Sequence, residues 1–433
     1  MDLTAETMQQ LYTLRTTMVK MIVVKRLLLC PPLYPPSRGG SQALFADLAE
    51  LWRRDGGEVV VCTSRLDSDQ DVADPEREGI TVRRFSARSC VTRPWQGRLL
   101  GAAARWGPIP WRAAVGFPHI LTRGYRRYLR RELAGRHGPF HLMVGGVLPH
   151  THFLEPAVRF AGRHGIPWVA VPLLHAGLLD VKPLRHVAGP AAGALLASAR
   201  TVVALTPAEI PGLLSLGVAR GRITILPAAL MDEATPRTAG GTAPVTPGHR
   251  PYVLQAGALA ADKGTDILLA AHARRVNAGA AEFLVLAGHP RPEVSRLLAG
   301  LPPAVRRQTL LVERPGEDRW RQIMSGAAVL VQPSRADSFG RVILEAWREG
   351  RPVIVAAAGG LPHLVRAGRD GHIVPAGDIP ALAAALDTVF GSPAAAARLG
   401  ATGRRRFLEH FTWRSVYPQW RQALSAAMAG SAA

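Results

Sequence analysis

The sequence is poor in cysteine, in acidic residues and in long apolar runs, and each shortage excludes a class of protein. Three cysteines lie far apart among 433 residues. This spacing fits neither a disulfide framework nor a zinc knuckle, and it favours a reducing, cytoplasmic compartment. Arg, Lys or Pro interrupts every apolar stretch before the roughly 20 residues that a membrane-spanning helix requires. The chain is long enough for two or three globular domains.

The shortage of acids leaves a strongly basic chain. Lysines and arginines outnumber aspartates and glutamates by 53 to 32, which gives a net charge of +21 and a sequence pI near 11.3. Such a charge attracts nucleic acid, anionic lipid or phosphorylated substrates. Charge alone does not choose among these three partners.

Short apolar runs alternate with helical stretches along the chain, which is typical of βαβ units around a parallel sheet. In the first half the expected strands are "VVKRLLLC", "EVVVC", "FHLMVGG", "IPWVAVPLL", "ARTVVAL" and "GRITILP". In the second half they are "YVLQAG", "AEFLVLAG", "QTLLVER", "AAVLVQPS", "RPVIVAA" and "GHIVPAG". The expected fold is therefore α/β, with two doubly wound Rossmann-like domains that face a central cleft where a ligand binds.

The alternation lapses in the stretch "MDEATPRTAGGTAPVTPGHRP", which is rich in Pro, Gly and Thr and is the best candidate for a linker. The alanine-rich stretches 188–199 and 381–401 are expected to be helical. The expected organisation is an N-terminal extension (1–20), a first domain (21–231), a linker (232–250), a second domain (251–411) and a C-terminal helix (about 412–433) that packs back on the first domain.

Residues 333–346, "PSRADSFGRVILEA", join the end of one expected strand to an expected helix. Asp337 or Ser338 can cap that helix, and the amides of residues 339–341 then face outward as a site for an anion or a hydroxyl. Glu345 follows Ser338 by seven residues, about two helical turns, and lies on the same face. Sugar hydroxyls suit Asp337 and the amides, and ribose hydroxyls suit Glu345.

A purely structural interpretation of the same stretch stays open. Asp337 is then only a helix cap, and Glu345 pairs with Arg341 four residues earlier.

Three more loops follow expected strands and contain glycine. Lys263 stands just ahead of a helix expected to start at Thr265, where a lysine meets a diphosphate beside the positive end of the helix dipole. Gly359–Gly360 and Gly39–Gly40 mark places where backbone is expected to approach a ligand closely.

At this point the chain resembles the family-4 glycosyltransferases of GT-B fold, from about residue 25 to residue 420 and most densely between 252 and 377. The family motif of two acids seven residues apart, ending in Phe-Gly-x-x-x-Leu-Glu-Ala, corresponds to Asp337 through Glu345, with Asp in place of the commoner first Glu. The resemblance implies retaining, metal-independent transfer of a hexosyl group from a nucleotide sugar. It implies no cofactor, because the nucleotide sugar is a substrate.

The resemblance also assigns roles to residues. It implies that Asp337 and the neighbouring amides hold the donor sugar, that Glu345 holds the ribose and that Lys263 holds the diphosphate. The strand in "PWVAVPLLHAG" resembles the one that ends in the family's acceptor-side histidine. The candidate catalytic residues are thus His175, Lys263 and Asp337, and the candidate donor-binding residues are Gly39, Gly40, Lys263, Asp337, Ser338, Phe339, Gly340, Arg341 and Glu345.

The chain departs from the family at two places. Ala258 stands where the family usually has an arginine that shares the diphosphate with Lys263; either Arg38 or Arg341 replaces that cation, or donor binding is weak, or the protein is not a catalyst. The Asn-Gly that often follows "IP" between the domains is also absent, and residues 226–229 read "LPAA".

Two other patterns are expected to be solvated or structural. Asp67 and Asp69 form a D-x-D string, but in a polar loop far in sequence from the donor motifs. His150 and His152 have no third ligand nearby, so a metal site is not expected.

Residues 84–136 combine many arginines with aromatic residues, among them Trp95, Trp106, Trp111, Phe117, Tyr125 and Tyr128, and end in "RGYRRYLRRELAGRH". Arginine with interfacial aromatics is typical of a protein lying on an anionic membrane surface, although a solvated basic helix or a nucleic-acid face stays open. No nucleic-acid motif accompanies the cluster. We expect contact with an anionic membrane or a phosphorylated acceptor, no nucleic acid, and a cytoplasmic protein peripheral to the inner face of the membrane.

The function expected from the sequence is transfer of a sugar to an acceptor hydroxyl, in cell-surface glycan, glycolipid or related glycoside synthesis. The acceptor is lipid-linked or phosphorylated in this interpretation. The alternatives are a non-catalytic subunit of glycosyltransferase type, or a nucleotide-sugar epimerase or phosphorylase on the same architecture.

Overall fold

The computed structural model describes residues 25–65, 79–86, 123–133, 139–148, 150–175, 190–231 and 244–430. The expected extension at 1–20, the Asp67–Asp69 string, Cys90 and most of the expected linker lie outside these ranges. So do the tryptophans of the basic cluster, Trp95, Trp106 and Trp111.

The first domain is built on a sheet of seven parallel strands in the order β3-β2-β1-β4-β5-β6-β7. The strands are β1 (Arg26–Cys30), β2 (Glu58–Arg65), β3 (Ile80–Ser86), β4 (Leu142–Gly145), β5 (Trp168–Ala170), β6 (Thr201–Ala204) and β7 (Ile223–Ile225). The helices are α2 (Gly40–Arg54), α5 (Arg123–Arg127), α7 (Thr151–Arg163), α9 (Pro190–Ala197) and α10 (Ile210–Ser215). A π-helix, η2 (Tyr128–Leu133), continues α5, and short 3₁₀ turns occupy Pro207–Glu209 and Arg220–Arg222.

The second domain contains six parallel strands in the order β10-β9-β8-β11-β12-β13. These are β8 (Tyr252–Leu259), β9 (Phe283–Pro290), β10 (Thr309–Glu313), β11 (Val329–Gln332), β12 (Val353–Ala356) and β13 (His372–Val374). Around them lie α11 (Thr265–Asn277), α12 (Pro292–Ala299), α13 (Pro303–Arg307), α14 (Glu317–Gly326), α15 (Arg341–Arg348), α16 (Leu361–Leu364), α17 (Ile379–Gly391) and α18 (Pro393–His410). A 3₁₀ turn at Pro247–His249 precedes β8.

The expected pair of doubly wound parallel sheets is confirmed. The central strands of each sheet are mainly apolar because helices cover both faces, which leaves no solvated side for polar residues to alternate toward. β4 and β11 are buried along their whole length. Each sheet reverses its order beside its first strand, so the loops after β1 and β8 open at the point where ligands of such sheets bind.

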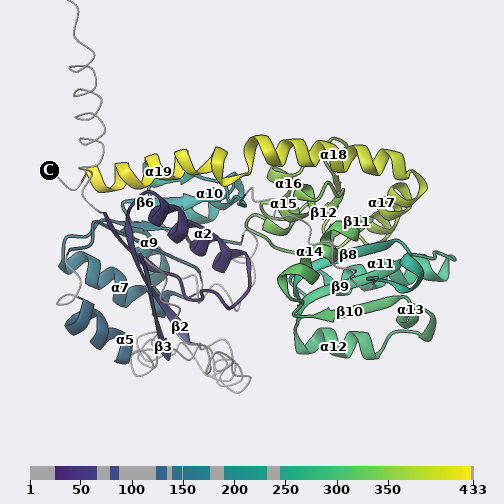
Figure 1. Cartoon of the computed structure of the whole chain (residues 1–433), viewed down its shortest axis with the longest axis horizontal. Helices are drawn as coiled ribbons and strands as arrows, with labels where there is room; N and C mark the ends of the chain where they lie inside the picture. Colours follow the sequence, from purple (N-terminus) through teal and green to yellow (C-terminus); the bar gives the residue numbers. More distant parts are fainter. Residues whose placement is uncertain are drawn as a thin grey trace, which may run out of the picture.

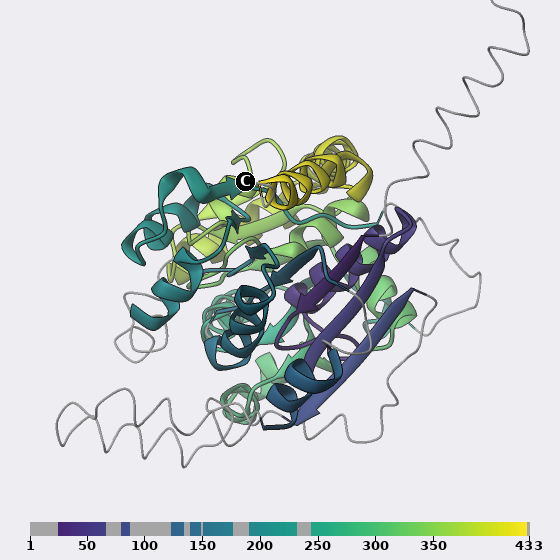
Figure 2. The same ribbon diagram turned by 90° about the vertical axis from the view of Figure 1, so that its left-hand side faces the viewer.

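The last helix, α19 (Trp413–Ala429), leaves the second domain and lies on the first (Figure 1). Trp420 donates a hydrogen bond from Nε1 to the carbonyl of Pro227 at 2.9 Å, and Tyr417 donates one to Asp55 of α2 at 2.9 Å. Seen from the first-domain side, the yellow C-terminal helices are viewed nearly end-on at the upper side of the molecule (Figure 2). The chain therefore crosses between the domains twice, once before β8 and once before α19.

No single helix in the described ranges has the length and apolar character needed to cross a membrane. Helices α17 and α18 meet that criterion only as a pair, and they are bent by 100° where they meet.

Two aromatic residues of the basic cluster belong to the core of the first domain. Tyr125 and Tyr128 are buried. The ring of Tyr125 stacks on Phe153 with centroids 4.6 Å apart, and both tyrosine rings contact Phe85 of β3. The expectation that these two aromatics face a membrane is wrong, because their rings fill the space between β3 and α7.

Candidate functional site

Lys263 and Asp337 meet at the carboxyl edge of the second sheet. Lys263 lies in the loop after β8 and Asp337 in the loop after β11, and β8 and β11 are hydrogen-bonded neighbours. The Nζ of Lys263 is 3.1 Å from Oδ2 of Asp337 and 3.4 Å from the carbonyl of Ala336. The two side chains are only 16% and 10% exposed. The sequence placed both residues in the candidate site, and the structure joins them as an ion pair.

The carboxylate of Asp337 is held by several donors. Gln332 of β11 donates at 3.2 Å, Ser334 at 3.4 Å and the amide of Phe339 at 3.4 Å. Burial raises the pKa of Asp337, but the positive charge of Lys263, the field of His175 and the donated hydrogen bonds outweigh it and bring the pKa to about 2. Asp337 is therefore ionised throughout the physiological range.

His175 reaches this pair from the first domain, at the end of the loop after β5. Burial and the charge of Lys263 lower its pKa, against the opposing fields of Asp337 and Asp262. The imidazole is thus neutral near pH 7 and able to accept or donate a hydrogen bond. His175, Lys263 and Asp337 come from different domains, and the fold brings them close enough to influence one another electrostatically.

A buried carboxyl group fixes the backbone beside His175. Glu209 is fully buried and accepts hydrogen bonds from the amide of Leu174 and from the amide of Leu205, each at 2.7 Å. It therefore ties the loop after β5 to the loop after β6. Burial raises the pKa of Glu209 to about 8 despite these donors. The sequence analysis missed this residue.

Helix α15 begins at Arg341, and its N-cap is Gly340 with φ of 84°. The expectation that Asp337 or Ser338 caps the helix is wrong. The chain makes a left-handed turn at Gly340 that only glycine adopts without strain, and this turn moves both side chains away from the capping position. The helix starts without a side-chain cap, and so do α2 and α11. Their first amides are available to an anionic ligand.

Close packing of one loop on another explains two of the expected ligand-facing glycines. A Cβ at Gly359 would lie 2.1 Å from the carbonyl oxygen of Asp337, and one at Gly360 would lie 2.1 Å from that of Ser338. The amide of Gly360 donates to Asp337 O at 2.8 Å. These glycines let the loop after β12 pack closely against the loop that carries Asp337. They therefore support the site indirectly, by holding that loop in place.

Gly39 and Gly40 form the start of α2 and face the second domain. Gly40 is the first residue of the helix, and a Cβ there would lie 3.7 Å from Cβ of Arg341. The N-termini of α2 and α15 therefore face each other across the domain boundary. Thr206 adds a second link nearby, because its hydroxyl donates to the carbonyl of Ser338 at 3.1 Å.

Glu345 lies on α15, about one helical turn after the helix begins at Arg341. It accepts a hydrogen bond from Nε1 of Trp320 on α14 at 2.8 Å. Burial raises its pKa, and the charge of Arg341 and the Trp320 bond offset this only in part. The indole fixes one carboxylate oxygen, and the second oxygen has no hydrogen bond from the described residues.

Arg341 pairs with Asp47 of α2, in the other domain. The distance is 2.6 Å, and the same carboxylate accepts from Nε1 of Trp413 at 2.8 Å. The structural alternative that paired Arg341 with Glu345 is wrong, because Asp47 takes the guanidinium. This interaction occupies Arg341 as a link between the domains.

Ala258 is exposed near the end of β8. Its register partner on β9 is His289. Burial lowers the pKa of His289, and the charges of Arg314, Arg38 and Arg291 lower it further. Arg38 also donates to the carbonyl of Pro315, so it spans the domains. Of the two replacements expected from sequence, Arg38 acts electrostatically on His289, the register partner of Ala258, and Arg341 is paired with Asp47.

The sequence analysis missed the residues that support the site. Gln255 of β8 donates from Nε2 to the carbonyl of Lys263 at 2.9 Å, and Gln332 of β11 donates from Nε2 to the carboxylate of Asp337 at 3.2 Å. The available signal was a glutamine inside an apolar strand, in "YVLQAG" and "VLVQPS". Such a buried amide requires a hydrogen-bonding partner.

In the ranges that the structure describes, no group of three or more His, Cys, Asp or Glu side chains could hold a metal ion. His150 precedes α7 as its N-cap residue.

Two family models cover most of the chain. Residues 39–229 match a glycosyl transferase 4-like domain, and residues 250–391 match glycosyl transferases group 1. D-inositol 3-phosphate glycosyltransferase of Streptomyces scabiei is 37% identical over 113 residues, which are 26% of this chain and 25% of that one. The same enzyme of Nocardia farcinica is 30% identical over 253 residues, 54% of each chain. The chain spans about a quarter of the length of the first curated relatives it matches.

Solved structures extend the likeness to the whole fold. Sucrose-phosphate synthase from Thermosynechococcus elongatus superposes with a TM-score of 0.73 and 21% identity, covering 94% of this chain and 100% of that one. Anabaena HepE in complex with UDP-glucose gives a TM-score of 0.66 and 18% identity, over 93% and 99% of the two chains.

The two facing doubly wound domains define the GT-B class of structures. Within that class, the chain belongs to the family-4 glycosyltransferases.

Proposed function

We propose that the chain is a retaining, metal-independent glycosyltransferase that moves a hexosyl group from a nucleoside diphosphate sugar to an acceptor hydroxyl. The observation that carries this proposal is the convergence of Lys263, Asp337 and His175 at the carboxyl edges of two facing sheets. The cation of Lys263, the anion of Asp337 and the neutral imidazole of His175 are close enough to influence one another. Together they suit a substrate that carries both phosphates and hydroxyls.

In this proposal the diphosphate binds at the uncapped start of α11, beside Lys263. Negative charge grows on the leaving phosphate as the glycosidic bond breaks, and Lys263 and the helix amides stabilise it. Asp337 is ionised, so it accepts hydrogen bonds from sugar hydroxyls. The amides at Phe339 and Gly340 contact the same sugar, and the free oxygen of Glu345 accepts from a ribose hydroxyl.

The cations around Ala258 supply the charge that an arginine at this position would bring. Arg38, Arg291 and Arg314 each influence His289, the neighbour of Ala258 in the sheet. We assign the second diphosphate contact to this group, with Arg38 crossing from the first domain. The observation favours a catalyst over a non-catalytic subunit.

The acceptor enters from the first domain and meets the sugar beside His175. Attack on the face that the diphosphate leaves preserves the anomeric configuration. A neutral imidazole there orients the sugar or the incoming hydroxyl by a hydrogen bond. Structures of a relative in complex with UDP and with UDP-glucose support a nucleotide-sugar donor. We place the acceptor among phosphorylated or lipid-linked alcohols of glycan or glycolipid synthesis, at the cytoplasmic face of the membrane.

A thermal-shift screen with UDP, GDP, ADP and dTDP, followed by turnover with the matching sugar nucleotide, tests the proposal. A ligand that binds only the folded state raises its melting temperature. We expect one diphosphate to raise it more than the others, and release of that diphosphate to require an acceptor alcohol. Activity that survives EDTA supports metal independence; loss on chelation that Mg²⁺ or Mn²⁺ restores contradicts it. Turnover without an acceptor indicates an epimerase instead.

A further inference from the structure

A cavity on the outer side of the first domain is surrounded by arginines that the donor site does not use. It has a volume of about 220 Å³ and lies between α5–η2 and α7. Its lining consists of Arg126, Leu129, Arg130, Pro156, Arg159, Phe160, Arg163 and His164. Figure 1 places α5 and α7 on the side of the first domain away from the second domain.

The topology separates this cavity from the donor site. Helix α7 begins after the carboxyl end of β4 and returns toward the start of β5, so Arg163 and His164 lie at the opposite edge of the sheet from His175. The cavity therefore cannot share a ligand with the Lys263–Asp337 pair.

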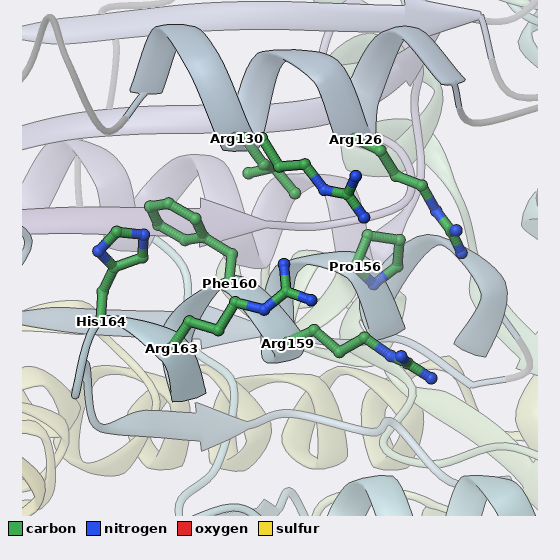
Figure 3. Close-up of a pocket in the computed structure, with 8 residues that line it drawn as sticks. Arg126, Arg130, Pro156, Arg159, Phe160, Arg163 and His164 are labelled. Atoms are coloured by element: carbon green, nitrogen blue, oxygen red, sulfur yellow. The ribbon is translucent and has the colours of Figure 1, made fainter.

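The charges lining the cavity are not balanced. Among the described residues its arginines have one carboxylate partner, Glu155, which lies 2.6 Å from Arg159 and 3.7 Å from Arg126. Arg130 and Arg163 make no ion pair with a described residue. Their side chains extend from two different helices into the space between those helices (Figure 3). Like charges that line one cavity repel, and a bound anion would relieve that repulsion.

Two further observations concern Arg126, which lines the same cavity. Burial lowers the pKa of Arg126, and the nearby charges of Arg159 and Arg130 lower it further against the attraction of Glu155. The Nε of Arg126 is buried and has no hydrogen-bond acceptor among the described residues. An anion in the cavity would offer oxygens to this group of donors.

The helix geometry holds the arginines in place. Residues 128–133 form a π-helix, a conformation that appears mostly as single turns and often at functional sites. Tyr128 and Leu129 anchor this turn in the core, and Arg130 then projects over the cavity (Figure 3). The volume equals that of roughly seven water molecules, which is enough for a tetrahedral oxyanion. Arginine forks suit such an anion because they donate to two of its oxygens at once.

We propose that this cavity binds a phosphate group, presented either by the headgroup of an anionic lipid or by a free phosphorylated molecule. The site is distinct from the donor site and adds a second anion-binding function to the chain. It also divides the arginines of the basic cluster into two sets. Arg126 and Arg130 line the cavity, whereas Arg127 and Arg131 are exposed on the same helical segment and do not.

That division supplies a matched control. One double variant, Arg130→Gln with Arg163→Gln, removes two charges from the cavity. The other, Arg127→Gln with Arg131→Gln, removes two charges from the adjacent surface. Both variants should keep the wild-type melting temperature and the nucleotide-induced shift, because the four side chains are exposed.

Two arms distinguish the source of the phosphate. The first is calorimetric titration with inorganic phosphate, in which the cavity variant should lose at least tenfold in affinity and the surface variant no more than about threefold. The second is sedimentation with vesicles of phosphatidylcholine, with and without phosphatidic acid. Preferential loss of acidic-vesicle binding in the cavity variant identifies a lipid headgroup. Loss confined to inorganic phosphate identifies a free phosphorylated ligand.

Equal losses in the two variants would overturn the proposal, because binding would then follow net charge and not the cavity. Wild-type protein that binds neither inorganic phosphate nor acidic vesicles would overturn it as well.

Discussion

Lys263 is the cation through which the charge on a departing diphosphate can be tested. Replacing it by alanine should reduce turnover on the order of a hundredfold to a thousandfold. The loss should exceed the loss of donor affinity, because the charge grows in the transition state. The measurement is kcat and KM for the donor that the thermal-shift screen selects.

Arg335→Ala is the matched control for that variant. Arg335 stands in the same pair of loops, but its guanidinium is turned to Asp266 at 2.7 and 2.8 Å and is exposed. We expect kcat to change less than threefold. Full activity in Lys263→Ala would remove the charge-stabilisation argument.

Glu345 should contribute to nucleotide affinity through its free oxygen. Glu345→Gln keeps the shape of the side chain and weakens a charge-assisted hydrogen bond, which is worth about 1.5–3 kcal/mol. Calorimetric titration with the preferred nucleoside diphosphate should show a loss of about tenfold or more. Trp320→Phe, which removes only the indole donor, should cause a smaller loss. Unchanged affinity in Glu345→Gln would show that the carboxylate only accepts the hydrogen bond from Trp320 of α14 and does not contact the nucleotide.

At the scale of single residues, sequence identified the groups with a chemical motif and missed their supports. Lys263, Asp337 and Glu345 could be named as candidates because the spacing of each relative to a strand or a helix is visible in the chain. Asp47 was not, because its partners Arg341 and Trp413 are 294 and 366 residues away. A contact of that separation leaves no local pattern in a single sequence.

At the scale of elements, the loops after β5 and β6 depend on the buried Glu209. Its pKa is about 8 in the folded protein and near 4.5 in an unfolded chain. Between those values the folded state holds a proton that the unfolded state has lost, so the free energy of unfolding falls as pH rises from about 4.5 to 8. The contribution is at most about 1.4 kcal/mol per pH unit.

The variant Glu209→Gln isolates that contribution. It should flatten the dependence of unfolding free energy on pH over this window, measured by denaturant titration at pH 5, 6, 7 and 8. Parallel curves for the wild type and the variant would contradict the assignment. The same substitution leaves one backbone amide without an acceptor, so the variant should also be less stable than the wild type at pH 5.

Most elements could be predicted because each buried strand is a short apolar run bounded by Gly, Pro or polar residues. Strand β3 was missed, since "ITVRRFS" contains two arginines. β3 is one of the two edge strands of its sheet. Arg84 in this strand is buried, and its guanidinium donates hydrogen bonds to the carbonyls of Tyr34 and Pro35. The alanine-rich stretch 381–401 was expected to be helical, and Pro393 begins a new helix within it, which separates α17 from α18.

At the scale of the whole molecule, Asp47 joins three helices from both domains. Its pair with Arg341 is 17% and 12% exposed, so Asp47→Asn leaves a guanidinium poorly solvated and without a counter-charge. We expect a loss of a few kcal/mol in unfolding free energy, by analogy with broken buried pairs. Chemical denaturation, followed by one spectroscopic probe in each domain, measures this loss of unfolding free energy.

Asp55→Asn provides the comparison. Asp55 also links the end of α2 to α19, through Tyr417 and Arg421, but it is exposed. Its loss should cost no more than about 1 kcal/mol. Equal effects of the two variants would mean that the Asp47 contact contributes no more than a surface pair.

The position of α19 has a consequence for the order in which the molecule is assembled on the ribosome. The first domain is synthesised before the second, yet Trp413 and Trp420, which are buried against it, come after the entire second domain. Until residues 413–429 leave the exit tunnel, the nascent first domain presents an uncovered apolar surface. The second domain is therefore synthesised while its neighbour is still incomplete, and the first domain is completed only when α19 packs on it.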